Sequence, residues 1–396
     1  MCADERALRW DGWANATVRS ATRAMDAAWH AVRDSFTGCA GYATHAPDGG
    51  SDDGATREGD ENDAMGRNRS VDLSGRTYVV TGVPTTAIAV ECAKRLSRAG
   101  ARVVCACADV KAGEEAFERE PETTESTTRD EEGDADGVKA KKRESPDEGE
   151  VVMLYCDLEK LETIESFVEA FCAKAWALDG ILNAETATMV EFGLTSDGIE
   201  RQFAVNHLAH FKLTALLMDE LVRTAAASGR EGRVVNLSSN LHHFTYRVRQ
   251  GTIKPSRGID FVNLNSDMGY TPMNSYGQSK LANILHAWTL SERLAKNGSP
   301  VRCVAATPGM TELELERSLA FPGGSFLSSL LKSTVTSSLE DAVMTPLYCL
   351  TAAKLPPGTY FSKCLPVKSS LPSRDPRLAS KLWEFSEEMA FTTERA

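Results

Sequence analysis

Two side chains four residues apart could move a proton in this 396-residue chain. Tyr276 and Lys280 lie in a predicted helix over Ser275–Lys296, where residues i and i+4 project from one face. A phenol, whose ordinary pKa is about 10, exchanges its proton poorly near neutrality, but a neighbouring ammonium stabilises the phenolate. The pair therefore suits general acid–base catalysis. The same spacing is common on ordinary helix surfaces, so the pair alone does not decide the function.

A pair of serines could lie near this helix. Ser238 and Ser239 directly follow the strand-like run Arg233–Leu237. At the carboxyl end of a parallel strand, a hydroxyl faces the crevice in which such sheets bind ligands. A strand in this place would therefore bring a serine hydroxyl to the edge of the sheet at which a ligand would bind.

Short apolar runs alternate with longer helical stretches from Arg76 onward. The strand-like runs are Tyr78–Gly82, Val103–Cys107, Val151–Cys156, Gly180–Asn183, Arg233–Leu237 and Val301–Ala305; the helical stretches include Ile88–Arg98, Leu161–Trp176, Leu208–Ala226 and Ser275–Lys296. This alternation indicates βαβ crossovers and a parallel sheet covered on both faces. The predicted fold class is α/β, a Rossmann-type doubly wound parallel sheet in a single domain over residues 75–396.

The first predicted strand leads through a turn into a helix. Thr81 and Gly82 end the strand, and the helix begins near Ile88. In a dinucleotide-binding fold the pyrophosphate lies at this helix N-terminus, whose free N–H groups and dipole favour anions. A strand, a turn and a helix with one glycine also occur in proteins without a nucleotide, so both interpretations stay open here.

Three segments lie outside this pattern. Residues 1–74 hold 13 acidic and 8 basic residues and residues 111–150 hold 15 and 7, so with a total charge of −12 the rest is nearly neutral. We predict a disordered acidic linker over 37–74 and a disordered acidic insertion over 111–150. Apolar residues mostly three to five apart predict an amphipathic helix over 1–36, which would pack on the body or a partner, or lie on a membrane surface.

Composition argues against several classes of protein. An acidic chain without a basic stripe is a poor nucleic-acid binder, and no run of 18 apolar residues predicts a membrane-spanning helix. The ten cysteines lie singly in apolar runs, so we expect a reducing compartment and no disulfide framework. Cys105 and Cys107 lack a second Cys or His pair nearby, and we expect no metal site. The first residues contain no apolar stretch typical of a secretory signal.

Several motifs resemble the short-chain dehydrogenase/reductase family over residues 76–110 and 151–392. They are Val205-Asn206-His207-Leu208, Arg230 to Ser239, and Tyr276-Gly277-Gln278-Ser279-Lys280 with the residues that follow to Ala287. Within that family they resemble the retinol-dehydrogenase-like branch, and most of all a member associated with the chloroplast envelope. The terminal Lys381-Leu382-Trp383-Glu384-Phe385-Ser386 has no catalytic reason to match and adds to that resemblance.

The resemblance implies a seven-stranded parallel sheet and a catalytic set. In this set Ser239 hydrogen-bonds the substrate oxygen and Tyr276 gives or takes its proton. Lys280 lowers the pKa of the phenol and holds the nicotinamide ribose, and Asn206 helps to hold a water that relays protons. No role is expected for His207, and none for the histidines at 242 and 243.

The resemblance also implies a set of cofactor-binding residues: Thr81, Gly82, Thr85, Thr86, Ala87, Ile88, Asp157, Leu158, Asn183, Ala184, Tyr276, Lys280, Pro308 and Gly309. Asp157 would accept from the adenine amino group, or alternatively cap the next helix. The chain departs from the family at three positions. Ala87 and Ala89 replace glycines that permit close approach to phosphate, and Glu185 brings a carboxylate near the dinucleotide.

The cofactor and substrate classes follow from the same resemblance. Members of the family that prefer NAD have an acid after the second strand, and those that prefer NADP have an Arg. This chain has Cys107 at the position of the acid and Ala108 at the position of the Arg. The absence of an acid favours NADP, and NAD is not excluded. Residues 310–340 would form a lid whose apolar residues suit a lipophilic alcohol or carbonyl and suit ordinary packing of the lid equally well.

Three hypotheses stay open. The first is an NADP-dependent oxidoreductase, the second an NADPH-sensing or scaffold protein at a membrane with little turnover, and the third an inert partner-binding module. A homo-oligomer is common in the family. The chloroplast is the implied compartment, with the cytoplasm as the alternative.

Overall fold

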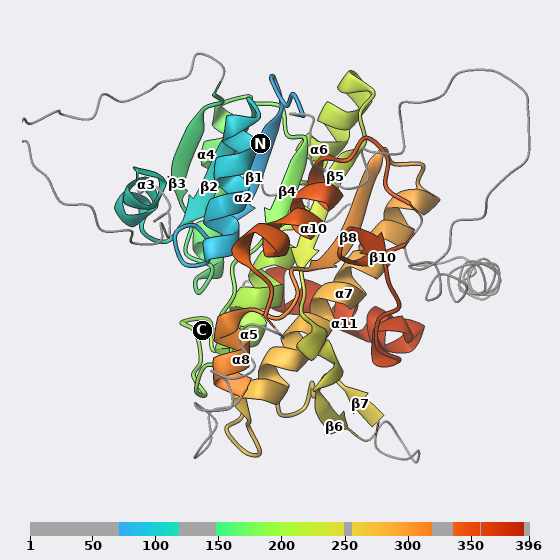
Figure 1. The fold of residues 1–396 in the computed structure, drawn as a ribbon. Helices are drawn as coiled ribbons and strands as arrows, with labels where there is room; N and C mark the ends of the chain where they lie inside the picture. The colour runs from blue at the N-terminus through green and yellow to red at the C-terminus, as the bar shows by residue number, and fades with distance from the viewer. Residues whose placement is uncertain (1–70, 119–147, 249–255, 319–335, 357, 392–396) are drawn as a thin grey trace, which may run out of the picture. The chain divides into compact units, whose positions relative to one another are not determined.

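The computed structural model describes residues 71–118, 148–248, 256–318, 336–356 and 358–391 (Figure 1). The expected N-terminal helix, the expected linker up to residue 70 and residues 119–147 of the expected insertion lie outside these ranges.

One mixed sheet forms the centre of the described fold. Its strands are β1 (Thr77–Thr81), β2 (Arg102–Cys107), β3 (Val151–Tyr155), β4 (Gly180–Asn183), β5 (Gly232–Leu237), β8 (Val301–Thr307), β9 (Tyr360–Ser362) and β10 (Leu365–Pro366). Their order is β10-β9-β8-β5-β4-β1-β2-β3. Seven of them are parallel, as predicted, and β10 pairs antiparallel with β9 at one edge. A separate hairpin joins β6 (Tyr246–Val248) and β7 (Ser256–Gly258).

Helices cover both faces of the sheet (Figure 1). The helices are α2 (Ala87–Arg98), α3 (Val110–Glu118), α4 (Leu161–Ala173), α5 (Arg201–Phe203), α6 (Ala209–Ser228), α7 (Pro272–Lys296), α8 (Glu312–Ser318), α10 (Leu339–Thr351) and α11 (Pro376–Phe391), with short turns η4 (Ala204–Leu208), η5 (Asn240–His243) and η6 (Pro372–Arg374). Helices α2 and α10 pack together on one face, α4, α6 and α7 cover the other, and α11 packs on α6 and α7. The fold is the predicted doubly wound α/β fold.

Burial explains why these residues form these elements. All five residues of β1 are buried, because a parallel sheet between two helical layers has no solvent face. Helix α2 turns Ala89, Cys92, Ala93 and Leu96 inward at helical spacing, and its first turn is capped by Thr86, whose hydroxyl accepts from the Ala89 N–H at 3.3 Å.

The order of the strands fixes where ligands bind. The chain runs from β1 outward to β2 and β3, then crosses back to β4 on the other side of β1. The crevice at such a switch point, outside the carboxyl ends of β1 and β4, is the binding place in open α/β sheets.

The prediction of disorder is wrong for parts of two segments. Residues 111–118 of the expected insertion belong to α3, whose first turn is capped by Asp109 through the Ala112 N–H at 3.0 Å. Phe117 holds this helix against the core, with the Lys94 ammonium 5.8 Å from its ring centre. Leu73, at the end of the expected linker, is also buried in the core. Composition pointed to polar loops because these few apolar anchors were outnumbered by charged neighbours.

The described residues contain no metal cluster, no membrane-spanning helix and no disulfide. Among the described residues, no three His, Cys, Asp or Glu side chains lie close enough together to hold a metal ion. No helix of the described part is long and apolar enough to cross a membrane. The eight described cysteines are all free thiols, and six are buried.

Candidate active site

Helix α7 brings Tyr276 and Lys280 together, as their spacing predicts. The Lys280 ammonium lies 5.4 Å from the centre of the Tyr276 ring, and each residue is 2% exposed. Lys280 Nζ donates to the Thr186 hydroxyl at 2.8 Å and to the Leu237 carbonyl at 3.3 Å. These bonds fix the charge at the meeting point of α7, the end of β5 and the loop after β4.

The end of β5 is bound tightly to α7. The Ser238 hydroxyl donates to the Lys280 carbonyl at 2.9 Å, and the Asn283 amide donates to the Leu237 carbonyl at 2.9 Å. Ser239 then begins η5, and its hydroxyl accepts from the Leu241 N–H at 3.2 Å. A hydroxyl that accepts one N–H keeps its own proton to donate, which suits the predicted contact of Ser239 with a substrate oxygen.

Gly277 allows α7 to lie directly against the turn that carries Ser239. A Cβ atom on Gly277 would lie 1.9 Å from the Phe244 carbonyl oxygen and 2.8 Å from that of Leu241. Both contacts are with backbone atoms, which cannot move aside as a flexible side chain can. The glycine between the tyrosine and the lysine is therefore a packing requirement of the site.

We expect Gly277→Ala to lower the free energy of unfolding by about 3 kcal/mol or more, since overpacking against a fixed backbone is costly. Catalytic turnover should fall as well, because Ser239 would move away from Tyr276. Urea unfolding of the purified variant measures the first effect. Gly193→Ala is the matched control, because its Cβ would meet only the Arg201 side chain at 3.6 Å. Equal stability of the two variants would contradict the assigned packing.

Asn206 holds the loop after β4. It lies in η4, a wide π-helical turn between α5 and α6, where the Ala209 N–H bonds the Ala204 carbonyl. Its side-chain oxygen accepts from the Ala187 N–H at 2.7 Å, and its amide donates to the Ala187 carbonyl at 2.9 Å and to the Ser279 hydroxyl at 2.9 Å. Asn206 is thus connected to the reacting residues through Ala187, next to Thr186, and Ser279, next to Lys280. The water expected beside Asn206 stays a prediction.

Thr81 is buried and fully hydrogen-bonded. Its hydroxyl oxygen accepts from the Ala184 and Glu185 N–H groups at 2.8 and 3.0 Å and lies 2.8 Å from His210 Nε2. His210 Nδ1 lies 3.1 Å from the Asn206 carbonyl, which can only accept, so Nε2 is the nitrogen that accepts from Thr81. The Thr81 hydroxyl therefore positions the loop after β4, and the contact of Thr81 with the cofactor stays a prediction.

Asn183 also faces the interior. Its amide donates to the Thr214 hydroxyl at 3.0 Å and to the Asn236 side-chain oxygen at 2.8 Å, which leaves its backbone for the predicted cofactor contact. Ala184 is buried as well.

The turn from β1 to α2 has the shape expected of a phosphate-binding turn. Gly82 has φ +95°, and a Cβ there would lie 2.9 Å from the Glu185 nitrogen. Thr86, which caps α2, also donates to the Gly82 carbonyl at 3.3 Å. Thr85 and Ala87 are exposed and Ile88 is half-buried, so this side of the turn is open.

Glu185 crosses to that turn. Its carboxylate accepts from the Thr85 hydroxyl and, at 2.9 Å, from the Thr186 N–H. Burial raises the pKa of the Glu185 carboxyl, against the effects of these two hydrogen bonds and of the Lys280 charge. The carboxylate therefore does not point away from the crevice.

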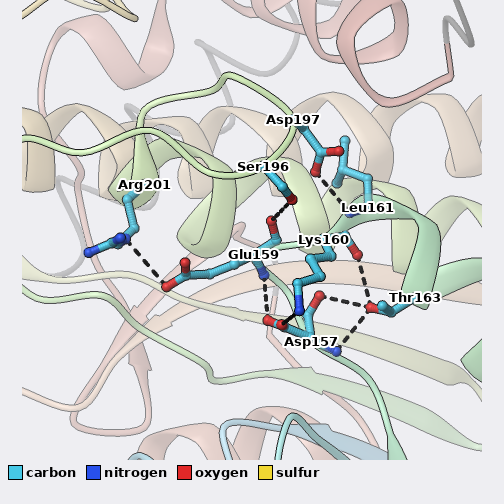
Figure 2. Close-up of polar contacts among 8 residues, drawn as sticks. All are labelled: Asp157, Glu159, Lys160, Leu161, Thr163, Ser196, Asp197 and Arg201. Carbon is cyan, nitrogen blue, oxygen red and sulfur yellow. Dashed lines mark hydrogen bonds and ion pairs between the residues drawn. The ribbon is translucent and has the colours of Figure 1, made fainter.

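Asp157 lies after β3 in a polar cluster with the first turn of α4 (Figure 2). Its carboxylate accepts from the Glu159 N–H at 3.0 Å and pairs with Lys160 Nζ at 3.0 Å. The first N–H of α4 is bonded instead by Asp197, at 3.0 Å from the Leu161 nitrogen, so the alternative prediction that Asp157 caps this helix is wrong. The Asp157 side chain keeps 20% exposure, and its contact with adenine stays a prediction.

The loop before α6 meets the same cluster. Figure 2 shows Arg201 directed at Glu159, 3.4 Å apart, and Ser196 donates to the Glu159 carbonyl. Leu158, predicted to bind cofactor, is buried beneath this turn.

The last residue of β2, Cys107, and the residue after it, Ala108, are not acids. Cys107 is buried beneath Met153, and burial raises the pKa of its thiol to about 12. Ala108 is exposed, and the Asp109 carboxylate is turned to the N-terminus of α3.

Apolar side chains surround the Tyr276 ring. Met189 and Leu241 form a buried cluster with it, and Met273 and Met310 pack against this cluster. Met310 follows Pro308 and Gly309, which continue β8 at the same edge of the sheet. Of the expected lid, residues 310–318 and 336–340 are described; the Ser337 N–H donates to the Met310 carbonyl at 2.9 Å, and residues 319–335 lie outside the described ranges.

Two histidines have structural positions. His242 Nδ1 donates to the Ser239 carbonyl at 2.7 Å, and its Nε2 accepts from the Ser370 N–H at 3.1 Å. His207 bonds the Ser386 hydroxyl at 2.8 Å. Neither contact reaches the reacting side chains.

The motifs of the sequence did not predict a role for Thr186. It accepts a hydrogen bond from Lys280 at 2.8 Å and lies two residues past Ala184, in the loop after β4. A hydroxyl in a loop carries no periodic signal, so only the fold reveals its partner.

Comparisons with known proteins agree with this geometry. A family model described as short chain dehydrogenase matches residues 126–250. Short-chain dehydrogenase TIC 32 B, chloroplastic, of Brassica napus is 31% identical and is aligned over 80% of this chain and 89% of its own length. The chain belongs to the short-chain dehydrogenase/reductase family.

Further relatives place this short-chain dehydrogenase in the retinol-dehydrogenase-like branch. Retinol dehydrogenase 12 of Mus musculus is 33% identical over 81% of this chain and 88% of the relative. A crystal structure of an uncharacterized protein from Mycobacterium Paratuberculosis covers 81% of this chain and 94% of its own, with TM-score 0.56 and 27% identity. This short-chain dehydrogenase/reductase is an oxidoreductase of alcohols or carbonyls, in a family that uses the nicotinamide dinucleotides NAD and NADP.

The crevice suits such a dinucleotide. The first turn of α2 holds no acidic residue, its approach is open at Thr85 and Ala87, and Gly82 lets the loop after β4 close beside it. Lys280 and Tyr276 lie on the β5 side of the same edge. Glu185 opposes the fit, because its carboxylate reaches Thr85 in this turn.

Proposed function

We propose that this chain is an NADP-dependent oxidoreductase that transfers a hydride between nicotinamide and a lipophilic alcohol or carbonyl. The observation that carries the proposal is the setting of Tyr276. Its phenol ring has an ammonium 5.4 Å from the ring centre and also belongs to a cluster with Met189, Leu241, Met273 and Met310. A proton donor that has both apolar side chains and a cation around it suits a hydrophobic substrate with one polar oxygen.

The mechanism follows from these positions. Ser239 donates its free hydroxyl proton to the substrate oxygen and orients it. Tyr276 gives a proton to that oxygen in reduction and takes one in oxidation, while the Lys280 charge stabilises the phenolate. The apolar cluster excludes water from the carbon that changes oxidation state. The bound dinucleotide supplies or accepts the hydride.

The preference for NADP rests on the end of β2. An acid placed there would bond a ribose diol and repel a 2′-phosphate. Cys107 is buried, Ala108 is apolar and Asp109 is engaged by α3, while Lys111 is exposed on the first turn of that helix. The absence of an acid at Cys107 and Ala108 and the exposed Lys111 support the phosphorylated ribose.

Titration of the protein with NADPH and with NADH tests this. Energy transfer from Trp176, Trp288 and Trp383 to the reduced nicotinamide reports binding. We expect micromolar affinity for NADPH and about tenfold weaker affinity for NADH, followed by oxidation of NADPH with medium-chain aldehydes or retinal. No binding of either dinucleotide at millimolar concentration would exclude the proposed activity.

A cofactor-sensing protein with little turnover is the second candidate. The presence of Glu185 and of the Ala87 methyl group at the phosphate-binding turn favours it, because both weaken a dinucleotide site. A protein that binds NADPH and reduces no carbonyl in the panel would support this candidate.

The compartment proposed is the chloroplast. Its support is the chloroplastic relative from Brassica napus. Attachment to a membrane or partner through residues 1–36, and a homo-oligomer, stay proposals. A fluorescent fusion of the full chain in plant cells tests the compartment.

A further inference from the structure

We propose that Glu185 is a built-in competitor of the cofactor: its carboxylate occupies the phosphate-binding turn at the N-terminus of α2 and must leave before a dinucleotide pyrophosphate binds. The inference rests on the proposed function, because it requires that turn to receive a dinucleotide.

The geometry places Glu185 across the crevice. Its backbone follows β4, where the Glu185 N–H donates to Thr81 at 3.0 Å, and it lies against Gly82, since a Cβ on that glycine would be 2.9 Å from the Glu185 nitrogen. Its side chain then reaches the β1–α2 turn and accepts from the Thr85 hydroxyl. The carboxylate therefore bridges the two strands at the switch point, which is the place where the sheet order predicts a ligand.

The charges around this carboxylate explain why it lies there. A helix N-terminus attracts an anion, and the first turn of α2 supplies none of its own. The Thr186 N–H bonds the same carboxylate at 2.9 Å, and Lys280 adds a favourable charge, whereas Glu159 opposes it. Glu185 thus holds its negative charge beside this turn, through the Thr85 hydroxyl and the Thr186 N–H.

A pyrophosphate cannot share this place with the carboxylate. Two like charges a few ångströms apart repel strongly in a partly buried crevice. Part of the binding free energy of the cofactor is therefore spent on moving Glu185 away from Thr85. The wild-type protein therefore needs a higher concentration of dinucleotide for half-saturation than a variant with a neutral residue at position 185.

The test compares the full-length wild-type protein with Glu185→Gln and Glu185→Ala in fluorescence titrations with NADPH. We expect both variants to bind NADPH about tenfold more tightly. Binding of 2′-AMP, which lacks the pyrophosphate and is measured by calorimetry, should change by less than about twofold. Glu384→Gln removes the same charge from an exposed position on α11 and should match the wild type. Thermal melts of the free proteins check that each variant is folded.

The outcomes separate this inference from the proposed function. Unchanged or weaker NADPH binding in both Glu185 variants, with wild-type binding intact, overturns the inference and leaves the proposed function standing. Equal tightening in Glu384→Gln or for 2′-AMP overturns it too, because the effect would then be one of general charge. Absence of binding in every protein, variants included, refutes both proposals together.

Discussion

Tyr276→Phe should lower kcat/KM for carbonyl reduction by at least about a thousandfold, the upper range for removal of a general acid. The ring remains, so the cluster with Met189 and Leu241 should keep its packing and NADPH affinity should change by no more than about twofold. Loss of turnover without loss of binding is the signature of a group that moves a proton. Stopped-flow oxidation of NADPH with medium-chain aldehydes, together with the fluorescence titration, measures both quantities.

Tyr348→Phe is the matched control for this variant. Tyr348 is half-buried on α10, on the opposite face of the sheet from α7, and removal of its hydroxyl should leave kcat/KM unchanged. Retention of more than about a tenth of wild-type turnover by Tyr276→Phe would refute its role as the proton donor.

Acid should destabilise the protein steeply between about pH 6.5 and pH 5. Burial lowers the pKa of His210 and His242 to about 4 and that of His286 to about 3, and it lowers the pKa of His207 well below its ordinary value. These rings are neutral when folded and take up protons near pH 6.5 when unfolded. Because the unfolded state then binds more protons, stability is fully present above about pH 6.5 and falls as the pH is lowered toward the folded values.

The expected loss is large. Each such histidine lowers the free energy of unfolding by about 2 kcal/mol at about pH 5. His210, His242 and His286 together lower it by on the order of 6 kcal/mol, which is comparable with the whole stability of many domains. Urea unfolding at a series of pH values gives the slope directly.

His286→Asn isolates one of these contributions. Asparagine offers an acceptor to the Asn236 amide, which lies 3.1 Å from His286 Nδ1, and cannot take up the proton. The slope of unfolding free energy against pH should fall by about 1.4 kcal/mol per pH unit below about pH 6. An unchanged slope would show that the ring is charged, or exposed, in the folded protein.

The reacting residues could be found from the sequence because their geometry is local. Tyr276 and Lys280 are one helical turn apart, and Ser239 follows a strand, so the elements place these side chains, while the choice of Ser239 over Ser238 came from the family resemblance. Alternation of strands and helices likewise predicted the sheet. The helix at 110–118 was missed because its stability comes from a single packed ring, Phe117, which composition does not reveal.

The partners of the loop residues could not be found in this way. Thr81 was predicted to bind cofactor, and it is His210, 129 positions further along, that takes up its hydroxyl. The direction of the Glu185 side chain depends on Gly82 and Thr85 in the turn between β1 and α2. Such contacts are tertiary, and no spacing rule in the chain encodes them.

The turn that carries Ser239 is fixed late in the synthesis of the protein on the ribosome. It is held by His242, which binds the Ser370 N–H, and by Asn240, which accepts from the Tyr360 hydroxyl at 3.3 Å. Synthesis proceeds from the N-terminus, so Tyr276 and Lys280 emerge long before these anchors. A nascent chain halted before Tyr360 would contain every reacting side chain and still lack a fixed serine, so the oxidoreductase is completed only by the last part of its own translation.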